Sequence, residues 1–225
     1  MILAIDTSTA QGSVALADAG DTLAEISWTM DGNHSCRLGR LMREVLGLQA
    51  ISVGDLTAMV VATGPGSFSG TRVGISAGKG MAMSLGIPLV GVSTLDVIGF
   101  QGCHVSRRVR ALLPAGRQQV YSGVYEGTPS RFARVGALSL SSLEEEVERA
   151  GVDELLAGEG ARDVAAALGS HAGILIREPK TMRLRRAAFL AELGMRHLEA
   201  GGSDQLETLE PIYLRKSAAE EKRGL

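Results

Sequence analysis

The glycine-rich stretch at residues 62–82, ATGPGSFSGTRVGISAGKGMA, constrains the fold of this chain more than any other part of the sequence. It overlaps the end of an apolar run at residues 56–63 (LTAMVVAT), whose β-branched residues are typical of a buried strand. The run leads into Gly64-Pro65-Gly66-Ser67, where glycine permits a positive φ and proline fixes its own. Ser67 or Ser69 can then cap a helix whose free N–H groups face the loop. This succession of strand, loop and helix N-terminus predicts a candidate anion cradle.

One face of the predicted helix carries almost no side chains. Gly70, Gly74, Gly78 and Ala82 recur every four residues, which places them on the same side of a helix. An interior glycine costs about 1 kcal/mol relative to alanine, and close approach of another backbone would offset that cost. Two partners for this face remain open: the chain's own sheet, or a second helix that could belong to another chain.

The composition is that of an ordinary globular protein. The chain has 225 residues, of which 45% are hydrophobic and 21% charged, enough for one large or two small domains. A net charge of −2 and an aromatic content of 4% argue against a basic nucleic-acid surface and a base-stacking platform. No apolar run approaches the roughly 20 residues that span a bilayer, and no signal peptide is indicated. We therefore expect a cytoplasmic protein without membrane association.

The cysteines and histidines form no ligand pattern. Cys36 and Cys103 are far apart in the sequence, so we expect both to be reduced and buried. The four histidines show no paired spacing, and no metal site is predicted. His34 and Ser35 are adjacent, which suits helix capping better than a nucleophile–base pair.

The order of the apolar runs predicts an α/β protein with two lobes. Up to residue 102 the predicted elements follow the order βββαβαβα, which indicates a mixed sheet flanked by helices. Residues 103–184 predict a second, smaller α/β lobe. An amphipathic helix at about residues 185–201 is expected to pack on the first lobe, and residues 203–225 form a tail.

A first candidate site lies at the end of the first predicted strand. Asp6 is followed by Thr7 and Ser8 in a hydroxyl-rich turn, and then by Gly12. A carboxylate in that position could hold Mg²⁺ through water while the turn cradles phosphate. It could equally cap its own turn, and both alternatives remain open.

The glycine-rich loop is the better phosphate candidate, through Gly64, Gly66 and Ser67. It lacks the P-loop lysine pattern, because Lys79 lies inside the helix and too late to serve. A second turn, with Gly158 and Gly160, could let a flat ligand such as adenine approach the backbone, although it also fits an ordinary strand-to-helix turn.

No complete catalytic set is visible in the sequence. There is no nucleophile elbow and no Ser/His/Asp arrangement. Basic runs at residues 107–110 and 177–186 could meet RNA phosphates, or could be solvated faces. The sequence thus shows features of binding without those of catalysis.

Five motifs stand out when they are taken together: ILAIDTSTAQGSVAL at residues 2–16, His34-Ser35, GPGSFSGTR at residues 64–72, Ser93-Thr94-Leu95 and PIYLR at residues 211–215. In combination they resemble the TsaB (YeaZ) family, whose members are accessory proteins in making threonylcarbamoyl-adenosine in tRNA. The resemblance covers the first lobe closely, the second loosely and the tail by one motif.

The resemblance implies an actin/Hsp70/sugar-kinase type fold with two ribonuclease H-like lobes, and a non-catalytic scaffold role. It implies a TsaD-type catalytic paralogue and a TsaE-type ATPase as partners, tRNA contact only through the complex, and no cofactor of its own, with ATP and Mg²⁺ possible in the complex. Residues 34–48 and 69–85 would supply the helices that dock on the paralogue. We expect the isolated chain to homodimerise through the same surface, formed by Leu38, Leu41, Met42, Val45, Gly70, Gly74, Gly78, Met81 and Ala82.

One segment departs from the family pattern, in which an Asp-Ala-Arg-x-x-Glu-Val-Tyr run is usual. Residues 114–121 read PAGRQQVY, so Pro114 replaces the acid and Gln119 the glutamate. Two other functions remain as alternatives: an autonomous ATP-dependent phosphotransferase, suggested by Asp6 and the two glycine turns, and a peptidase.

Overall fold

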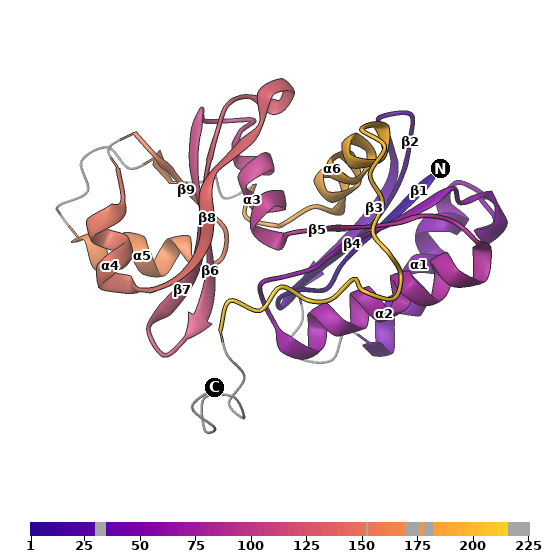
Figure 1. Ribbon diagram of the computed structural model, residues 1–225, viewed down its shortest axis with the longest axis horizontal. Coiled ribbons are helices and arrows are strands. Elements are labelled where there is room, and N and C mark those ends of the chain that lie inside the picture. Colours follow the sequence, from indigo (N-terminus) through magenta and orange to yellow (C-terminus); the bar gives the residue numbers. More distant parts are fainter. Residues whose placement is uncertain (30–34, 152, 170–175, 178–181, 216–225) are drawn as a thin grey trace. The chain divides into compact units, whose positions relative to one another are not determined.

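Two compact units make up the chain, as the computed structural model shows. It describes residues 1–29, 35–151, 153–169, 176–177 and 182–215 (Figure 1). The first unit comprises residues 1–97 and 180–211, and the second residues 98–179 and 212–225. Each unit has its own five-stranded mixed sheet with helices packed on it, which confirms the predicted fold class. No helix among the described residues is long and apolar enough to cross a membrane.

The sheet of the first unit has the strand order β3-β2-β1-β4-β5. The strands are β1 (Ile2–Asp6), β2 (Gln11–Asp18), β3 (Asp21–Thr29), β4 (Ala58–Ala62) and β5 (Leu89–Val92). β1 is antiparallel to β2 and parallel to β4, so the sheet is mixed. All residues of β1 and β4 are buried, as expected for central strands covered on both faces.

Helices cover both faces of this sheet (Figure 1). α1 (Ser35–Leu48) and α2 (Phe68–Leu85) pack on one face, where Leu3, Ile5 and Val61 belong to their core. α6 (Ala187–Glu199) packs on the other face, against Ala4 and Val60. The alternation of side chains along each strand thus supplies two separate cores. The expected packing of the helix at about residues 185–201 on the first lobe is confirmed.

The bare face of α2 packs on the chain's own sheet. Gly70, Gly74, Gly78 and Ala82 are all buried, and a methyl group added at Gly78 would lie 2.4 Å from Cγ1 of Val61. Gly74 lies close to the turn after β1, since an added methyl would lie 2.7 Å from Oγ1 of Thr7. The proposal that these four residues form a surface for another chain is therefore wrong.

The apolar stripe of α1 is also internal. Leu38, Leu41, Met42 and Val45 are buried, and three of them belong to the core shared with β1 and β4. Met81 of α2 is partly buried against the same core. An amphipathic stripe marks the buried side of a helix whether or not another chain is present. The pattern therefore did not distinguish packing on the chain's own sheet from contact with another chain.

The second sheet has the order β10-β9-β6-β7-β8. Its strands are β6 (Arg108–Gly116), β7 (Gln119–Glu126), β8 (Ala133–Ser142), β9 (Leu155–Ala157) and β10 (Ile176–Arg177). α4 (Leu143–Arg149) and α5 (Ala161–Leu168) share a core with β6, β7 and β9. Short 3₁₀ turns occur at Val53–Asp55 and Pro129–Arg131. Ser142 and Glu145 form a capping box at the start of α4.

The boundary between the units falls inside α3 (Thr94–Gly102), not after it as the sequence suggested. The part of α3 from Ile98 to Gly102 belongs to the second unit, where Gly99 packs on the ring of Tyr125 and Gly102 on Val109. The tail is likewise divided, with residues up to Pro211 in the first unit.

Two smaller expectations need comment. Cys103 is buried and burial raises its pKa to about 11, but Cys36 is exposed near the start of α1. His34, an expected helix-capping residue, lies outside the described residues.

The buried position of Gly78 gives a direct test of this packing. Gly78→Leu should lower the free energy of unfolding by about 2 kcal/mol or more, because the new side chain must displace Val61. Gly80→Leu on the same helix is the matched control, since nothing lies within 4 Å of a methyl group added there. We expect the control to be as stable as the unmodified chain or slightly more so, because leucine is the better helix former. Equal urea denaturation midpoints for the two variants would contradict this packing.

Candidate functional site

Asp6 ends β1 and is enclosed by groups of its own chain. Its Oδ1 accepts hydrogen bonds from the backbone N–H of Ser8 at 2.9 Å and from the Ser8 hydroxyl at 2.6 Å. Its Oδ2 accepts from Nε of Arg185 at 2.5 Å. The side chains of Asp6 and Arg185 are only 1% and 3% exposed, so this is a buried ion pair.

Further contacts fix Arg185 in this position. Its Nη2 donates to Oγ1 of Thr9 at 2.9 Å, and its backbone N–H donates to Oε1 of Gln11 at 2.8 Å. The amide of Gln11 in turn donates to the carbonyl oxygen of Arg183 at 3.0 Å. The segment just before α6 is therefore joined to the turn between β1 and β2.

This arrangement does not fit a magnesium site at Asp6. Both carboxylate oxygens already accept hydrogen bonds from protein donors, and the guanidinium supplies the positive charge that a cation would bring. The structural alternative for Asp6 is the one that the geometry supports. Arg185 is the residue that sequence reasoning missed, since it was counted only as part of a basic run.

The glycine-rich loop after β4 packs on the same turn. The backbone N–H of Ser67 donates to the carbonyl oxygen of Ser8 at 2.6 Å, and Ser67 Oγ accepts from the N–H of Gly70 at 3.2 Å. A methyl group added at Gly66 would lie 2.0 Å from the Ser8 oxygen, and one at Gly70 would lie 2.2 Å from the Thr7 oxygen. These glycines are required because two stretches of the same chain approach closely.

The remaining glycines proposed for a ligand also pack internally. A methyl group added at Gly12 would lie 2.4 Å from the ring of Trp28, and Gly64 accepts a backbone hydrogen bond from Thr94 at 2.8 Å. In the second unit, Gly160 donates to the carbonyl oxygen of Leu112 at 2.9 Å, and a methyl at Gly158 would lie 2.5 Å from that oxygen. The backbone of this turn thus rests on β6, where an adenine ring was considered.

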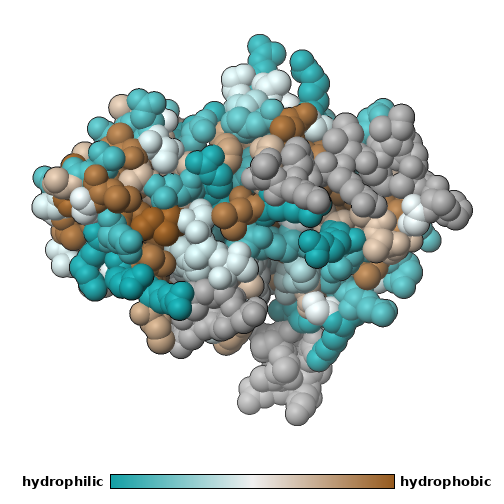
Figure 2. All heavy atoms as spheres, turned by 180° about the vertical axis from the view of Figure 1, so that it is seen from behind, coloured by the Kyte–Doolittle hydropathy of each residue, from teal (hydrophilic) through white to brown (hydrophobic). Residues whose placement is uncertain are grey.

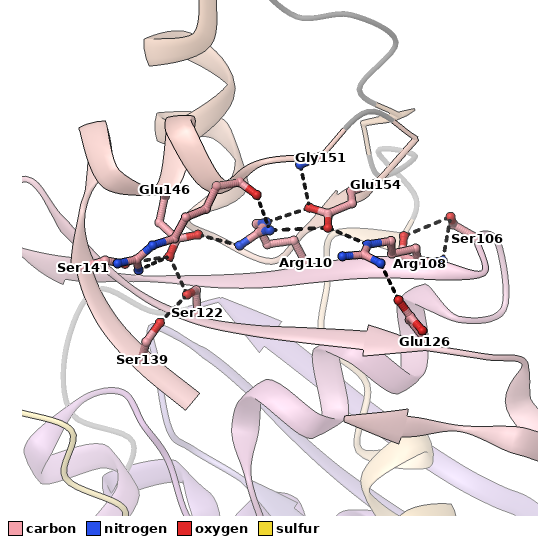
Figure 3. Close-up of polar contacts among 11 residues, drawn as sticks. Ser106, Arg108, Arg110, Ser122, Glu126, Ser139, Ser141, Glu146, Gly151 and Glu154 are labelled. Atoms are coloured by element: carbon pink, nitrogen blue, oxygen red, sulfur yellow. Dashed lines mark hydrogen bonds and ion pairs between the residues drawn. The ribbon is translucent and has the colours of Figure 1, made fainter. Parts of the chain in front are cut away.

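The second unit contains a buried charge network that the sequence did not predict (Figure 3). Glu154 accepts from Nε of Arg110 and from Nε of Arg108, each at 2.7 Å, and from the N–H of Gly151 at 3.2 Å. The Glu154 side chain is fully buried, and that of Arg110 is 6% exposed. The reading of residues 107–110 as an RNA-binding or solvated run is therefore wrong for Arg110.

A second carboxylate completes the network. Glu146 of α4 is fully buried and accepts from Nη1 of Arg110 at 3.0 Å, from Ser122 Oγ at 2.7 Å and from Ser141 Oγ at 2.6 Å (Figure 3). The guanidinium of Arg110 also donates to the carbonyl oxygen of Arg149 at 2.7 Å. The network joins α4 to three strands, and the burial of its carboxylates suits a structural role better than substrate contact.

Gln119, which replaces the glutamate of the family pattern, makes a hydrogen bond to the C-terminal PIYLR segment. Arg215 of the PIYLR segment donates a hydrogen bond to Oε1 of Gln119 on β7. An amide oxygen can accept this bond as a carboxylate would, although without the charge. Pro114 is exposed near the end of β6.

The charge of Glu154 should control the stability of the second unit. Burial alone would raise its pKa, but hydrogen bonds from Arg110 and Arg108 outweigh burial and hold the pKa below the usual value. A lowered folded-state pKa means that the ionised form stabilises the fold above a pH of about 4.3, and that this contribution is lost as the pH falls further. Glu154→Gln should cost about 3 kcal/mol near neutral pH by leaving Arg110 without one counter-charge.

The matched control is Glu126→Gln, which removes the half-exposed partner of Arg108. It should cost less than about 1 kcal/mol. Urea denaturation between pH 3 and 7 measures both effects. The account fails if the two variants lose equal stability, or if the loss in Glu154→Gln stays the same at every pH.

Comparison with known proteins places these features in a family. The family model described as "TsaD: tRNA N6-adenosine threonylcarbamoyltransferase" matches residues 24–223. The TsaB protein of Bacillus subtilis is 37% identical over 125 residues, which span 56% of this chain and 55% of that protein. The TsaB protein of Escherichia coli is 28% identical over 232 residues, which span 98% of this chain and 97% of that protein.

A solved structure agrees with the sequence comparison. YeaZ from Pseudomonas aeruginosa is 26% identical and superposes with a TM-score of 0.82, covering 95% of this chain and 99% of that one. Because the family model matches well over half of the residues, membership of the family is established. The chain belongs to the tRNA N6-adenosine threonylcarbamoyltransferase (TsaD) family, as a TsaB/YeaZ-type member with the actin/Hsp70/sugar-kinase type of fold.

Proposed function

We propose that this chain is a non-catalytic activator subunit in the formation of threonylcarbamoyl-adenosine in tRNA, and that it acts on a TsaD-type catalytic paralogue. The names of the relatives, "tRNA threonylcarbamoyladenosine biosynthesis protein TsaB", support the pathway. The observation that carries the non-catalytic role is the Asp6–Arg185 ion pair. A carboxylate paired in this way is not available to hold a metal–nucleotide complex.

We assign partner binding to the outward surface of α1 and α2, which replaces the inward surface inferred from the sequence. Large apolar side chains lie exposed on this surface, with Leu48 at 63%, Phe68 at 61% and Met83 at 70%. Arg72 stacks on the Phe68 ring, with its guanidinium carbon 3.4 Å from the ring centroid. Gly80 adds open space at the helix surface, which would let another helix approach closely.

This surface would accept the equivalent helix pair of a TsaD-type protein, forming a four-helix contact. Exposed apolar side chains on neighbouring helices are typical of interaction surfaces. In the view of Figure 2, hydrophobic residues lie at the surface over part of the first unit. The isolated chain would use the same outward surface to homodimerise, so that the catalytic partner competes with self-association.

The remaining parts of the proposal follow from the family. A TsaE-type ATPase would join the assembly, ATP and Mg²⁺ would act at the level of the complex, and tRNA would be contacted only through it. The chain would work in the cytoplasm. We propose neither an autonomous phosphotransferase nor a peptidase; the groups that suggested the first, Asp6 and the glycine-rich loop, are engaged within the chain.

The proposed function is tested by adding this chain to a TsaD-type protein from the same source and measuring threonylcarbamoyl transfer to tRNA. We expect no transfer by the chain alone and a clear increase when it joins the partner. Met83→Asp should reduce both the increase and the affinity for the partner at least tenfold, about 1.4 kcal/mol, because it buries a charge in the contact.

Val135→Asp is the matched control, because Val135 is 44% exposed on β8 of the second unit. It should leave the affinity and the increase unchanged. Transfer by the lone chain that disappears in Asp6→Ala would refute the non-catalytic role. Equal losses in Met83→Asp and Val135→Asp would refute the assigned surface.

A further inference from the structure

The buried guanidinium of Arg185 is connected to the first turn of α2 by a short series of hydrogen bonds. Arg185 binds Asp6, and Asp6 accepts from both the backbone and the hydroxyl of Ser8. The carbonyl oxygen of Ser8 accepts from the N–H of Ser67 at 2.6 Å, and the Ser67 hydroxyl caps α2 at Gly70. Two residues, Asp6 and Ser8, therefore separate Arg185 from the N-cap of this helix.

A parallel link makes the connection stiff. The hydroxyl of Thr7 donates to the carbonyl oxygen of Gly70 at 2.7 Å, inside the first turn of α2. There is no room for a side chain at Gly66 or Gly70, because their backbones lie directly against the oxygens of Ser8 and Thr7. A shift of the turn at Thr7 and Ser8 would therefore move the start of α2 with it.

The other end of the connection is fixed in the sheet and in α6. The hydrogen bonds between Gln11, Arg183 and Arg185 hold the segment before α6 on β2. The next residue, Arg186, pairs with Glu25 of β3 at 2.7 Å, and α6 begins at Ala187. Arg185 thus has a rigid base from which to hold Asp6.

We propose that Arg185 is a positioning residue for partner binding: an internal cation at Asp6 that sets the first turn of α2, and with it Phe68 and Arg72, in the geometry for docking. This inference rests on the proposed function, since it deepens the role of the outward surface of α1 and α2. In this role Arg185 balances the charge of the Asp6 carboxylate at the end of β1. The chain then needs no bound cation to order the outward surface of α1 and α2.

The test uses Arg185→Gln, Asp6→Asn and the double variant in the full-length chain, with Arg186→Gln as the matched control. Arg186 is the neighbouring arginine, but its side chain is 50% exposed and its ion pair is with Glu25 of β3. Two quantities are measured: amide hydrogen exchange at residues 67–72 without partner, and the affinity for the TsaD-type protein.

We expect Arg185→Gln and Asp6→Asn each to speed amide hydrogen exchange at residues 67–72 while β4 stays protected. Each variant should also lower the affinity for the TsaD-type protein about tenfold. The double variant should resemble either single one, because the two residues act as a pair. Arg186→Gln should leave both quantities unchanged. A merely structural role would instead speed exchange throughout the first unit.

The inference is overturned if Arg185→Gln folds and retains wild-type exchange at residues 67–72 and wild-type affinity. Should Arg185→Gln fail to fold, the double variant decides, because it removes both buried charges together; wild-type exchange and affinity in that variant would overturn the inference. If the unmodified chain does not bind the partner, the proposed function fails, while the exchange measurement still judges the link between Arg185 and α2.

Discussion

The buried ion pair between Asp6 and Arg185 is the contact on which the arrangement of the end of β1, the turn after it and the segment before α6 depends. A charge taken out of water is unfavourable unless a partner and hydrogen bonds compensate it, and here each group has both. The pair joins the end of β1 to the segment before α6, which packs on the opposite face of the sheet from α2. Loss of either partner would leave an uncompensated charge where three parts of the chain meet.

Close packing of backbones is the second constraint on this unit. Gly78 of α2 lies on Val61 from one side of the sheet, and Gly194 of α6 lies on Val60 from the other. Added methyl groups at either glycine would approach these valines to 2.4 Å. At these two points the helix backbones lie directly on the sheet, so the inner face of α2 is fixed.

Local features of this structure could be predicted from the sequence, whereas long-range pairings could not. The helix cap at Ser67 depends on neighbouring residues, and Ser67 is one of the two serines predicted for that position. The partner of Asp6 stands 179 positions away, and no local pattern marks it.

The run at residues 107–110 was misread because alternation along β6 directs Arg108 and Arg110 to the same side, where buried glutamates meet them. The spacing of Gly70, Gly74 and Gly78 was read correctly as a close contact, but periodicity does not say which backbone comes near.

The chain's own Arg185 occupies the place at Asp6 that a metal–nucleotide complex would need. Calorimetric titration of Mg-ATP into the isolated, unmodified chain tests it most directly. We expect weak binding or none, because neither oxygen of Asp6 is free and the glycine-rich loop rests on Ser8. A micromolar affinity, about −8 kcal/mol, would contradict the claim and favour a kinase-like function.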